Sequence, residues 1–114
     1  MMTDCLFCKI AQDEIEVDKL HDDDQVFSIR DINPRTPVHF MVIPKEHIPS
    51  VRDVTASHGS LLSHMIMIAD KVAQAEGVAE KGYRLAFNEG KDSGQSVFHI
   101  HMHVLGGKVL GPEA

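Results

Sequence analysis

Three histidines, His99, His101 and His103, stand at alternate positions of an otherwise apolar run that ends at Leu105. Because successive side chains of a β-strand point to opposite faces, this spacing predicts a strand with three imidazoles on one face and apolar side chains on the other. Imidazole serves proton transfer, nucleophilic attack and metal ligation near neutral pH, whereas a solvated strand face more commonly carries Thr, Lys or Glu. The run is therefore the candidate site.

A single metal ion bound by all three histidines is one alternative. At about 3.3 Å per residue, His99 and His103 lie roughly 13 Å apart along a strand. Zinc–nitrogen bonds are about 2.0 to 2.1 Å long, so both rings would have to stretch toward a shared ion. The spacing argues against a three-histidine metal centre, and a metal bound by one or two adjacent histidines stays open.

The two cysteines of the chain form a Cys5-x-x-Cys8 motif. In a reducing cytosol this spacing suggests metal or redox chemistry before a structural disulfide. Two ordinary small apolar residues near the N-terminus would give the same pattern. By itself the motif is therefore only half of a site, and its partners must come from elsewhere in the chain.

Length and composition limit the other functions. At 114 residues the chain fits one small domain spanning residues 1–114. A formal net charge of -6 gives no basic surface for a nucleic-acid duplex. No apolar stretch approaches the roughly 20 residues needed to cross a bilayer, and the N-terminus lacks the basic and apolar pattern of a signal peptide. We expect a soluble, cytoplasmic protein with no membrane and no duplex as partner.

Short periodic segments separated by Gly and Pro predict an α+β domain. The expected elements are a short helix over residues 5–12, strands over residues 26–30, 39–43, 83–88 and 99–105, and one long helix from residue 55 or 57 to residue 76. The acidic residues 22–24 are expected to form a solvated turn. Successive strands joined by short loops predict an antiparallel meander with the long helix packed on one face.

The histidine run and several further motifs resemble the histidine triad (HIT) family, whose motif is His-x-His-x-His followed by two apolar residues. The resemblance extends over residues 5–107, and Gly106-Gly107 favours the Hint branch over the Fhit branch. The matching segments are Asp31-Ile32-Asn33-Pro34, residues 39–48, Gly82-Tyr83-Arg84, Asn88-Glu89-Gly90 and Gly94-Gln95-Ser96-Val97.

This resemblance implies a HIT-like fold in a homodimer whose two sheets join into one. It also implies hydrolysis of purine nucleoside phosphoramidates, such as adenosine 5′-monophosphoramidate, through a covalent nucleotidyl-histidine intermediate, with purine nucleoside monophosphates as ligands. Attack on phosphorus needs a neutral imidazole nitrogen, and the departing amine needs a proton. Two alternatives stay open: a nucleotide-binding or interaction module with incidental hydrolysis, and a dinucleoside polyphosphate hydrolase.

The resemblance also assigns roles to individual residues. His101 matches the nucleophile, and His103 with Ser96 matches the pair that contacts phosphate and helps to protonate the leaving group. His99 flanks the nucleophile, and His39 matches a fourth histidine that orients the triad. The matching nucleotide-binding residues are Asp31, Ile32, Asn88, Gly94, Gln95, Ser96, His101, His103, Phe7, Ile10 and Ile29.

Within that binding set, Asp31 matches the acceptor for ribose hydroxyls, a role that suits an ionised carboxylate because it only accepts hydrogen bonds. Asn88 and the backbone donors at Gly94, Gln95 and Ser96 match the phosphate contacts. The apolar members match the clamp on the base. Loop capping by Asp31 and ordinary core packing of the apolar side chains are the alternatives.

The same resemblance implies the other ligands of a metal site at the cysteine motif. Together with His47 and His99, Cys5 and Cys8 resemble the Cys2His2 zinc site of some bacterial members. Two thiolates and two neutral imidazoles give zinc a closed tetrahedral shell, which suits a structural ion. We expect such an ion to fix the ring of His99 while its backbone carbonyl orients His101. Other Hint proteins lack these cysteines, so the chemical step should require no metal.

Overall fold

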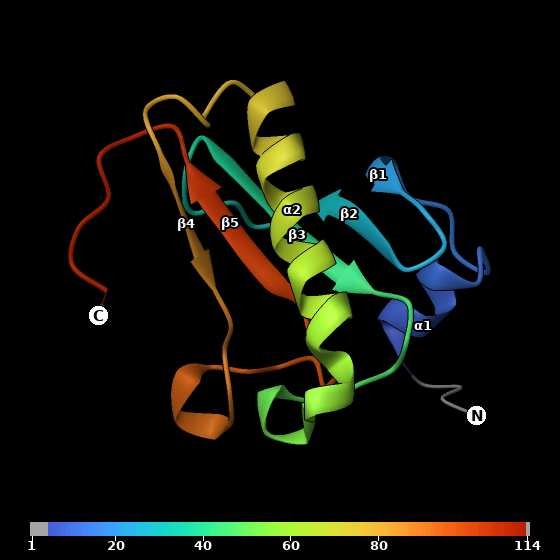
Figure 1. The fold of residues 1–114 in the computed structure, drawn as a ribbon. Coiled ribbons are helices and arrows are strands. Elements are labelled where there is room, and N and C mark those ends of the chain that lie inside the picture. The colour runs from blue at the N-terminus through green and yellow to red at the C-terminus, as the bar shows by residue number, and fades with distance from the viewer. Residues whose placement is uncertain (1–4, 114) are drawn as a thin grey trace.

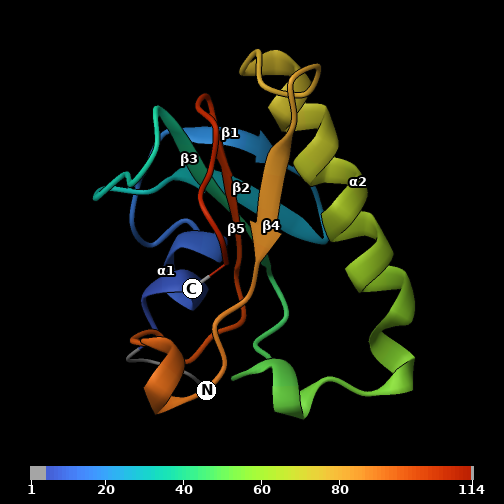
Figure 2. The same cartoon turned by 90° about the vertical axis from the view of Figure 1, so that its left-hand side faces the viewer.

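A five-stranded antiparallel sheet forms the centre of the computed structural model, which describes residues 5–113 (Figure 1). The strands are β1 Lys19–Asp22, β2 Val26–Arg30, β3 Val38–Pro44, β4 Tyr83–Ala86 and β5 Met102–Gly106. The helices are α1 Leu6–Ala11 and α2 Gly59–Ala75, with 3-10 turns at Val51–Asp53, Ala56–His58 and Lys91–Ser93. The two helices lie on opposite sides of the sheet (Figure 2). The predicted α+β class is confirmed.

The strand order is β1-β2-β3-β5-β4, which departs from a simple meander at one point. After β3 the chain crosses one face of the sheet as α2 and returns at the outer edge as β4 (Figure 1). The last strand then inserts between β3 and β4, antiparallel to both. Because β5 is hydrogen-bonded to a strand on each side, the end of the histidine run lies on an interior strand of the sheet.

Alternation of side chains along β3 supplies two hydrophobic cores. Phe40 and Val42 pack with the buried side of α2, in a cluster that includes Met65. Met41 belongs instead to the cluster on the α1 side of the sheet. Since His39 is two residues from Met41, it shares that second face. The α1 side of the sheet therefore carries the polar groups of the site.

The predicted long helix is present as α2, but it begins at Gly59, after the 3-10 turn Ala56–His58, and not at residue 55 or 57; its last residue, Ala75, is one before the predicted end. The Thr55 and His58 side chains form a capping box around the turn that precedes α2. Gly77, at φ +80°, follows the last residues of the helix in a conformation that suits glycine. α2 is the longest helix with 17 residues, and no helix within residues 5–113 is both long and apolar enough to span a membrane.

The predicted strand over residues 99–105 is wrong at its start, because the strand begins only at Met102. The residues before it contact the segment that follows β3: the Ile100 amide donates to the Ile48 carbonyl at 2.7 Å. Pro44, the last residue of β3, has no N–H and cannot extend the ladder. His99 and His101 are therefore placed by an irregular connection, and of the triad only His103 lies in a strand.

The acidic segment is more than a solvated turn, and the sequence analysis missed the short edge strand β1 that leads into it. The Asp23 carboxylate accepts hydrogen bonds from the ring nitrogens of His21 and His64, both at 2.7 Å. It also accepts from the backbone amides of Gln25 and Val26 at 2.7 and 2.8 Å. This one carboxylate therefore shapes the β1–β2 turn and ties it to α2.

Candidate functional site

The hydrogen bond between His101 and His99 decides which nitrogen of His101 is available for chemistry. The Nδ1 atom of His101 lies 2.8 Å from the backbone oxygen of His99. Because a carbonyl oxygen only accepts, Nδ1 carries the hydrogen. In a neutral ring, Nε2 then keeps its lone pair. The arrangement makes His101 Nε2 a nucleophile without any further proton transfer.

His39 and His103 form a second hydrogen-bonded pair. They come from β3 and β5, where His103 is in register with Met41, so the two histidines are diagonal neighbours on one face. His39 Nε2 lies 2.9 Å from His103 Nδ1. The backbone amide of Arg35 donates to His39 Nδ1 at 3.2 Å. A chain of contacts therefore runs from a loop amide through His39 to His103.

The burial of this pair fixes its hydrogens. Burial lowers the pKa of His39, whose side chain is only 1% exposed, so the ring is neutral. Since Nδ1 accepts from Arg35, Nε2 of His39 carries the hydrogen and donates to His103. Burial, assisted by His101 and His39, also lowers the pKa of His103 to about 4. Neutral His103 thus accepts at Nδ1 and bears a hydrogen at Nε2.

Asp31 lies beside this pair. Its Oδ2 atom is 3.4 Å from His39 Nε2 and 3.8 Å from His103 Nδ1, and its Oδ1 accepts the Asn33 amide at 2.9 Å. The carboxylate, His39 and His103 lie close enough to hold a metal ion. However, the Arg35 amide leaves His39 Nε2 with a hydrogen, so that nitrogen is a donor and not a ligand. The capping alternative for Asp31 is also observed, and one carboxylate oxygen remains beside the histidines.

A cavity of about 400 Å³ opens beside His101 and His103. All of the predicted nucleotide-binding residues line it: Phe7, Ile10, Ile29, Asp31, Ile32, Asn88, Gly94, Gln95, Ser96, His101 and His103. The lining combines apolar side chains with hydroxyl, amide and imidazole groups, which suit a base and a phosphate respectively. Ile32 is 91% exposed and so stands at the rim.

Gly94 and Gln95 line the cavity, but their backbone amides are already used. The Gly94 amide donates to the Lys91 carbonyl at 3.1 Å and the Gln95 amide to the Gly90 carbonyl at 3.3 Å. The Gln95 side chain in turn accepts from the Gly90 amide at 2.8 Å and donates to the Pro49 carbonyl at 3.2 Å. These residues brace the loop in this structure, and their amides would have to exchange these partners to donate to a phosphate.

Ser96 differs from its two neighbours. Among the hydrogen bonds within residues 5–113, none engages its amide or its hydroxyl. Both groups are therefore available to phosphate oxygens in the cavity that Ser96 lines. The donor role predicted for the loop is concentrated on one residue.

A larger depression of about 980 Å³ adjoins the cavity and shares five lining residues with it: Ile15, Val17, Ile29, Arg30 and Ile32. The remaining lining comes from residues 13–22, and no histidine, cysteine or serine belongs to it. Size alone would favour this depression. The groups that can do chemistry lie in the smaller cavity, which is therefore the candidate active site.

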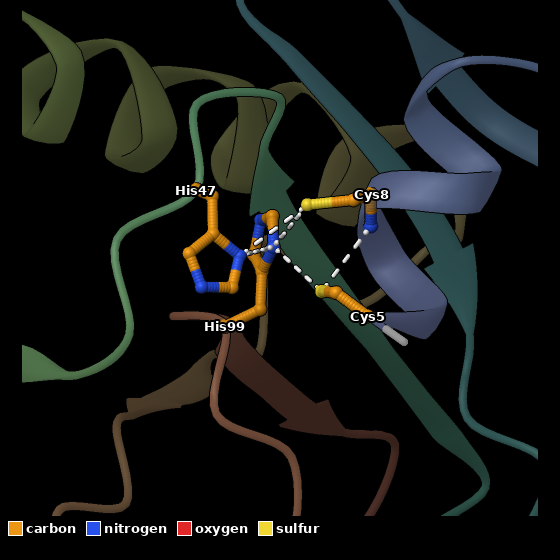
Figure 3. Close-up of side chains that lie close together, drawn as sticks. All are labelled: Cys5, Cys8, His47 and His99. Atoms are coloured by element: carbon orange, nitrogen blue, oxygen red, sulfur yellow. Dashed lines mark hydrogen bonds between the residues drawn. The ribbon is translucent and has the colours of Figure 1, made fainter. Parts of the chain in front are cut away.

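Four side chains meet on the other side of His99 (Figure 3). His99 Nδ1 lies 3.3 Å from the sulfur of Cys5, 3.6 Å from that of Cys8 and 3.1 Å from His47 Nδ1. The Cys8 sulfur is also 3.3 Å from His47 Nδ1. In a tetrahedral zinc site the ligand atoms are about 3.4 to 3.6 Å apart, so these four residues fit one ion.

The ring of His99 is set for ligation. Its Nε2 lies 2.7 Å from the Pro44 carbonyl and must donate to it, which leaves a lone pair on Nδ1 of the neutral ring. Burial lowers the pKa of His99, so the ring is neutral. Burial, assisted by Cys5, raises the pKa of the metal-free Cys8 thiol to about 11. A metal ion would replace that thiol proton.

Comparisons with known proteins agree with this geometry. The HIT domain family model matches residues 12–110. The chain belongs to the HIT domain family. It is 48% identical over 112 residues to the purine nucleoside phosphoramidase of Escherichia coli K12, which covers 98% of this chain and 94% of that protein.

Two solved structures extend the comparison. The HIT family hydrolase from Clostridium thermocellum matches with a TM-score of 0.94 at 45% identity, over 99% of this chain and 98% of that one. A zinc-bound histidine triad family protein from Mycobacterium smegmatis matches with a TM-score of 0.79 at 28% identity, over 95% and 78% of the respective chains. The HIT fold of this chain is therefore established by both sequence and structure.

Sequence reasoning missed Arg35 in this HIT site. The residue lines the cavity, and its amide sets the hydrogen-bonding state of His39. The available signal was its position in the Pro-rich loop between Asp31 and His39, both of which were singled out. A backbone donor leaves no trace in residue type, so only the fold reveals it.

Proposed function

We propose that this HIT protein hydrolyses purine nucleoside phosphoramidates through a nucleotidyl intermediate on His101. The observation that carries the proposal is the donation from His101 Nδ1 to the His99 carbonyl at 2.8 Å, which leaves Nε2 as the free nucleophile. The cavity beside it, lined by apolar side chains and by hydroxyl, amide and imidazole groups, supports a nucleotide as substrate. The relative from E. coli named as a purine nucleoside phosphoramidase supports the reaction class.

Substrate binding divides the cavity into three parts. The base packs among Phe7, Ile10 and Ile29, with Ile32 at the rim. The ribose hydroxyls donate to the Asp31 carboxylate. The phosphate lies at the end formed by Asn88, Ser96, His101 and His103, where the Ser96 hydroxyl and amide donate to its oxygens.

The chemistry then follows in two displacements. His101 Nε2 attacks the α-phosphorus, the phosphorus–nitrogen bond breaks, and the amine leaves with a proton. Water next attacks the same phosphorus, the bond to Nε2 breaks, and the nucleoside monophosphate and neutral His101 are formed. The His99 carbonyl stabilises the imidazolium character of the intermediate through the Nδ1 hydrogen bond.

His103 and Ser96 handle charge and protons at the phosphate. Negative phosphate beside His103 favours its charged form and raises a pKa that burial holds at about 4 in the free protein. Asp31, 3.8 Å from His103 Nδ1 and 3.4 Å from His39 Nε2, stabilises the added positive charge. With substrate bound, His103 can therefore be protonated, and His103 and Ser96 can pass a proton to the departing amine.

We also propose a structural zinc ion held by Cys5, Cys8, His47 and His99. The donor set, the contacts of 3.1 to 3.6 Å among its atoms and the Nε2–H bond of His99 to Pro44 support it. When bound, the ion supplies a covalent-like tie between α1 and the histidine segment and no catalytic water position. The reducing cytoplasm expected from the sequence suits a site that needs two thiolates.

A homodimer of single HIT domains spanning residues 1–114 completes the proposal. β4 is an edge strand of the sheet, and such an edge can pair with the same strand of a second copy. α2 additionally exposes Ile66 and Met67, at 53% and 67%, which a partner could bury. Sedimentation equilibrium of the wild type and of Met67→Glu tests this: a monomeric wild type contradicts it.

Steady-state hydrolysis of adenosine 5′-monophosphoramidate, compared with a diadenosine polyphosphate, tests the proposed reaction. We expect fast phosphoramidate turnover in the wild type. His101→Asn removes the Nε2 nucleophile, so turnover should be lost while AMP binding is retained. Equal rates for the two proteins would reject His101 as the nucleophile. Preference for the dinucleotide would favour the polyphosphate hydrolase alternative, and AMP binding without turnover of either compound would favour a binding module.

A further inference from the structure

We propose that Cys5 and Cys8 are a redox-sensitive pair, and that their oxidation to a disulfide dismantles the metal site and weakens nucleotide binding. The disulfide part rests only on the cysteine geometry. The effect on nucleotide binding rests on the proposed function of the cavity. A two-electron oxidant such as hydrogen peroxide is the co-reactant.

The two sulfurs are already directed at one point. They lie 3.3 and 3.6 Å from the same atom, His99 Nδ1 (Figure 3). Cys5 is the N-cap of α1, and its sulfur accepts the Cys8 amide at 3.4 Å. Residues three apart in a helical turn have Cα atoms about 5 Å apart, within the range of disulfides. The bond can therefore form by side-chain rotation, with α1 in place.

Exposure gives the two cysteines different parts in the reaction. Cys5 is partly exposed, whereas Cys8 is buried at 6% exposure, so the oxidant meets Cys5 first. The Cys5 thiolate takes one oxygen from hydrogen peroxide and becomes a sulfenic acid, and hydroxide leaves. The Cys8 sulfur then attacks Cys5, the sulfur–oxygen bond breaks, and a disulfide and water form. Two electrons pass from the sulfurs to the peroxide.

Disulfide formation removes both sulfur ligands at once. Only His47 and His99 remain, and two imidazoles do not close the four-coordinate shell of a structural zinc. The tie between α1 and the segment before β5 is then lost. Phe7 and Ile10 still pack on the sheet with Phe27, so α1 stays folded against the sheet but less firmly held.

The change reaches the nucleotide cavity through Phe7. Its ring meets the rings of His99 and His101 edge-on, at centroid distances of 5.8 and 5.2 Å. Phe7 and Ile10, both on α1, also line the cavity. Loosening α1 therefore disturbs the wall that packs against the base and the ring of the nucleophile. AMP affinity should fall while the sheet remains folded.

The test exposes the zinc-loaded protein to hydrogen peroxide and follows three signals: intact mass, zinc released to a colorimetric chelator, and the Kd for AMP. We expect loss of two hydrogens per chain, one zinc released per disulfide, and AMP binding weakened several-fold. Dithiothreitol with added zinc should restore all three. Cys5→Asp is the matched variant, since a carboxylate can cap α1 and ligate zinc but cannot form a disulfide. It should keep its zinc under peroxide.

Three results would overturn the inference. The first is that Cys5 and Cys8 stay reduced at a peroxide concentration that oxidises free glutathione in the same sample. The second is oxidation to sulfinic acid in place of a disulfide. The third is a disulfide that leaves the AMP Kd unchanged. If the protein binds no zinc, only the metal proposal is contradicted, because intact mass and AMP binding still test the cysteine pair. If the reduced protein shows no turnover, only the proposed reaction is contradicted.

Discussion

The backbone oxygen of His99 accepts a hydrogen bond from His101 Nδ1 at 2.8 Å, while the ring of His99 faces the two cysteines. One fully buried residue thus belongs to two sites, with its carbonyl in the first and its imidazole in the second. The carbonyl orients the ring of His101, the proposed nucleophile, and the ring of His99 can hold a metal ion. Each function is separately testable, because the backbone survives substitutions that remove the metal.

Metal removal should affect stability more than catalysis. Chelation of the zinc-loaded protein is expected to lower Tm on the order of 10 °C, equivalent to about 2 kcal/mol for a domain of this size. Turnover at saturating substrate, measured below the new Tm, should largely remain because no proposed step uses the ion, although AMP binding is weaker once α1 is less firmly held. Cys8→Ser should match the chelated wild type in both measurements. Abolished turnover with an intact circular dichroism spectrum would contradict this division.

The contact between His39 and His103 should matter for turnover and little for binding. His39→Leu removes the donor to His103 Nδ1, and kcat should fall by about 100-fold. His39 does not line the cavity, so the AMP Kd should change little. His39→Gln keeps an N–H donor near the position of Nε2 and should recover much of the lost rate. Equal losses in the two variants would indicate a packing role in place of hydrogen-bond donation.

Ribose recognition by Asp31 can be isolated with a substrate lacking one hydroxyl. Asp31→Asn should weaken binding of the ribonucleotide substrate by about tenfold or more, as expected for loss of a hydrogen bond to a charged group. With the 2′-deoxy substrate the same change should cost much less. Measurement of kcat/KM for both proteins and both substrates gives the coupling between the carboxylate and the hydroxyl. Additive effects would contradict a direct contact.

Hydrophobic periodicity in the sequence predicts the α+β class, and the resemblance to the HIT family assigns residues that the structure places around one cavity. The sequence does not predict where the histidine strand begins: alternation continues back to His99, but Pro44 ends the ladder that those residues would need. The short polar strand β1 was missed because it pairs only at a sheet edge. Residue types also cannot show that the Gly94 and Gln95 amides are occupied.

Acid should destabilise the protein through His103. Its pKa is about 4 in the folded protein and 6.5 as the ordinary value, so the unfolded chain takes up the proton first as pH falls. Stability is therefore lost between about pH 6.5 and pH 4, by about 2 kcal/mol at pH 5 for this group. Burial shifts His39 and His99 in the same direction.

Urea unfolding at pH 7 and pH 5 measures this loss. His103→Gln should show a smaller difference between the two pH values than the wild type, because it removes one of the three imidazoles whose pKa burial lowers. Lys71→Gln is the control, since Lys71 is an exposed residue of α2 outside the site. Identical pH dependence in the wild type and His103→Gln would contradict the assigned shift.

The central claim is a covalent bond between His101 Nε2 and phosphorus, and rapid-quench mass spectrometry tests it most directly. Reactions with adenosine 5′-monophosphoramidate are stopped in alkali, where phosphoimidazoles survive, and the protein is digested and sequenced. We predict one adenylyl group on His101 in the wild type and none in His101→Asn. Steady hydrolysis with no adduct at any time, or an adduct on another residue, would contradict the account.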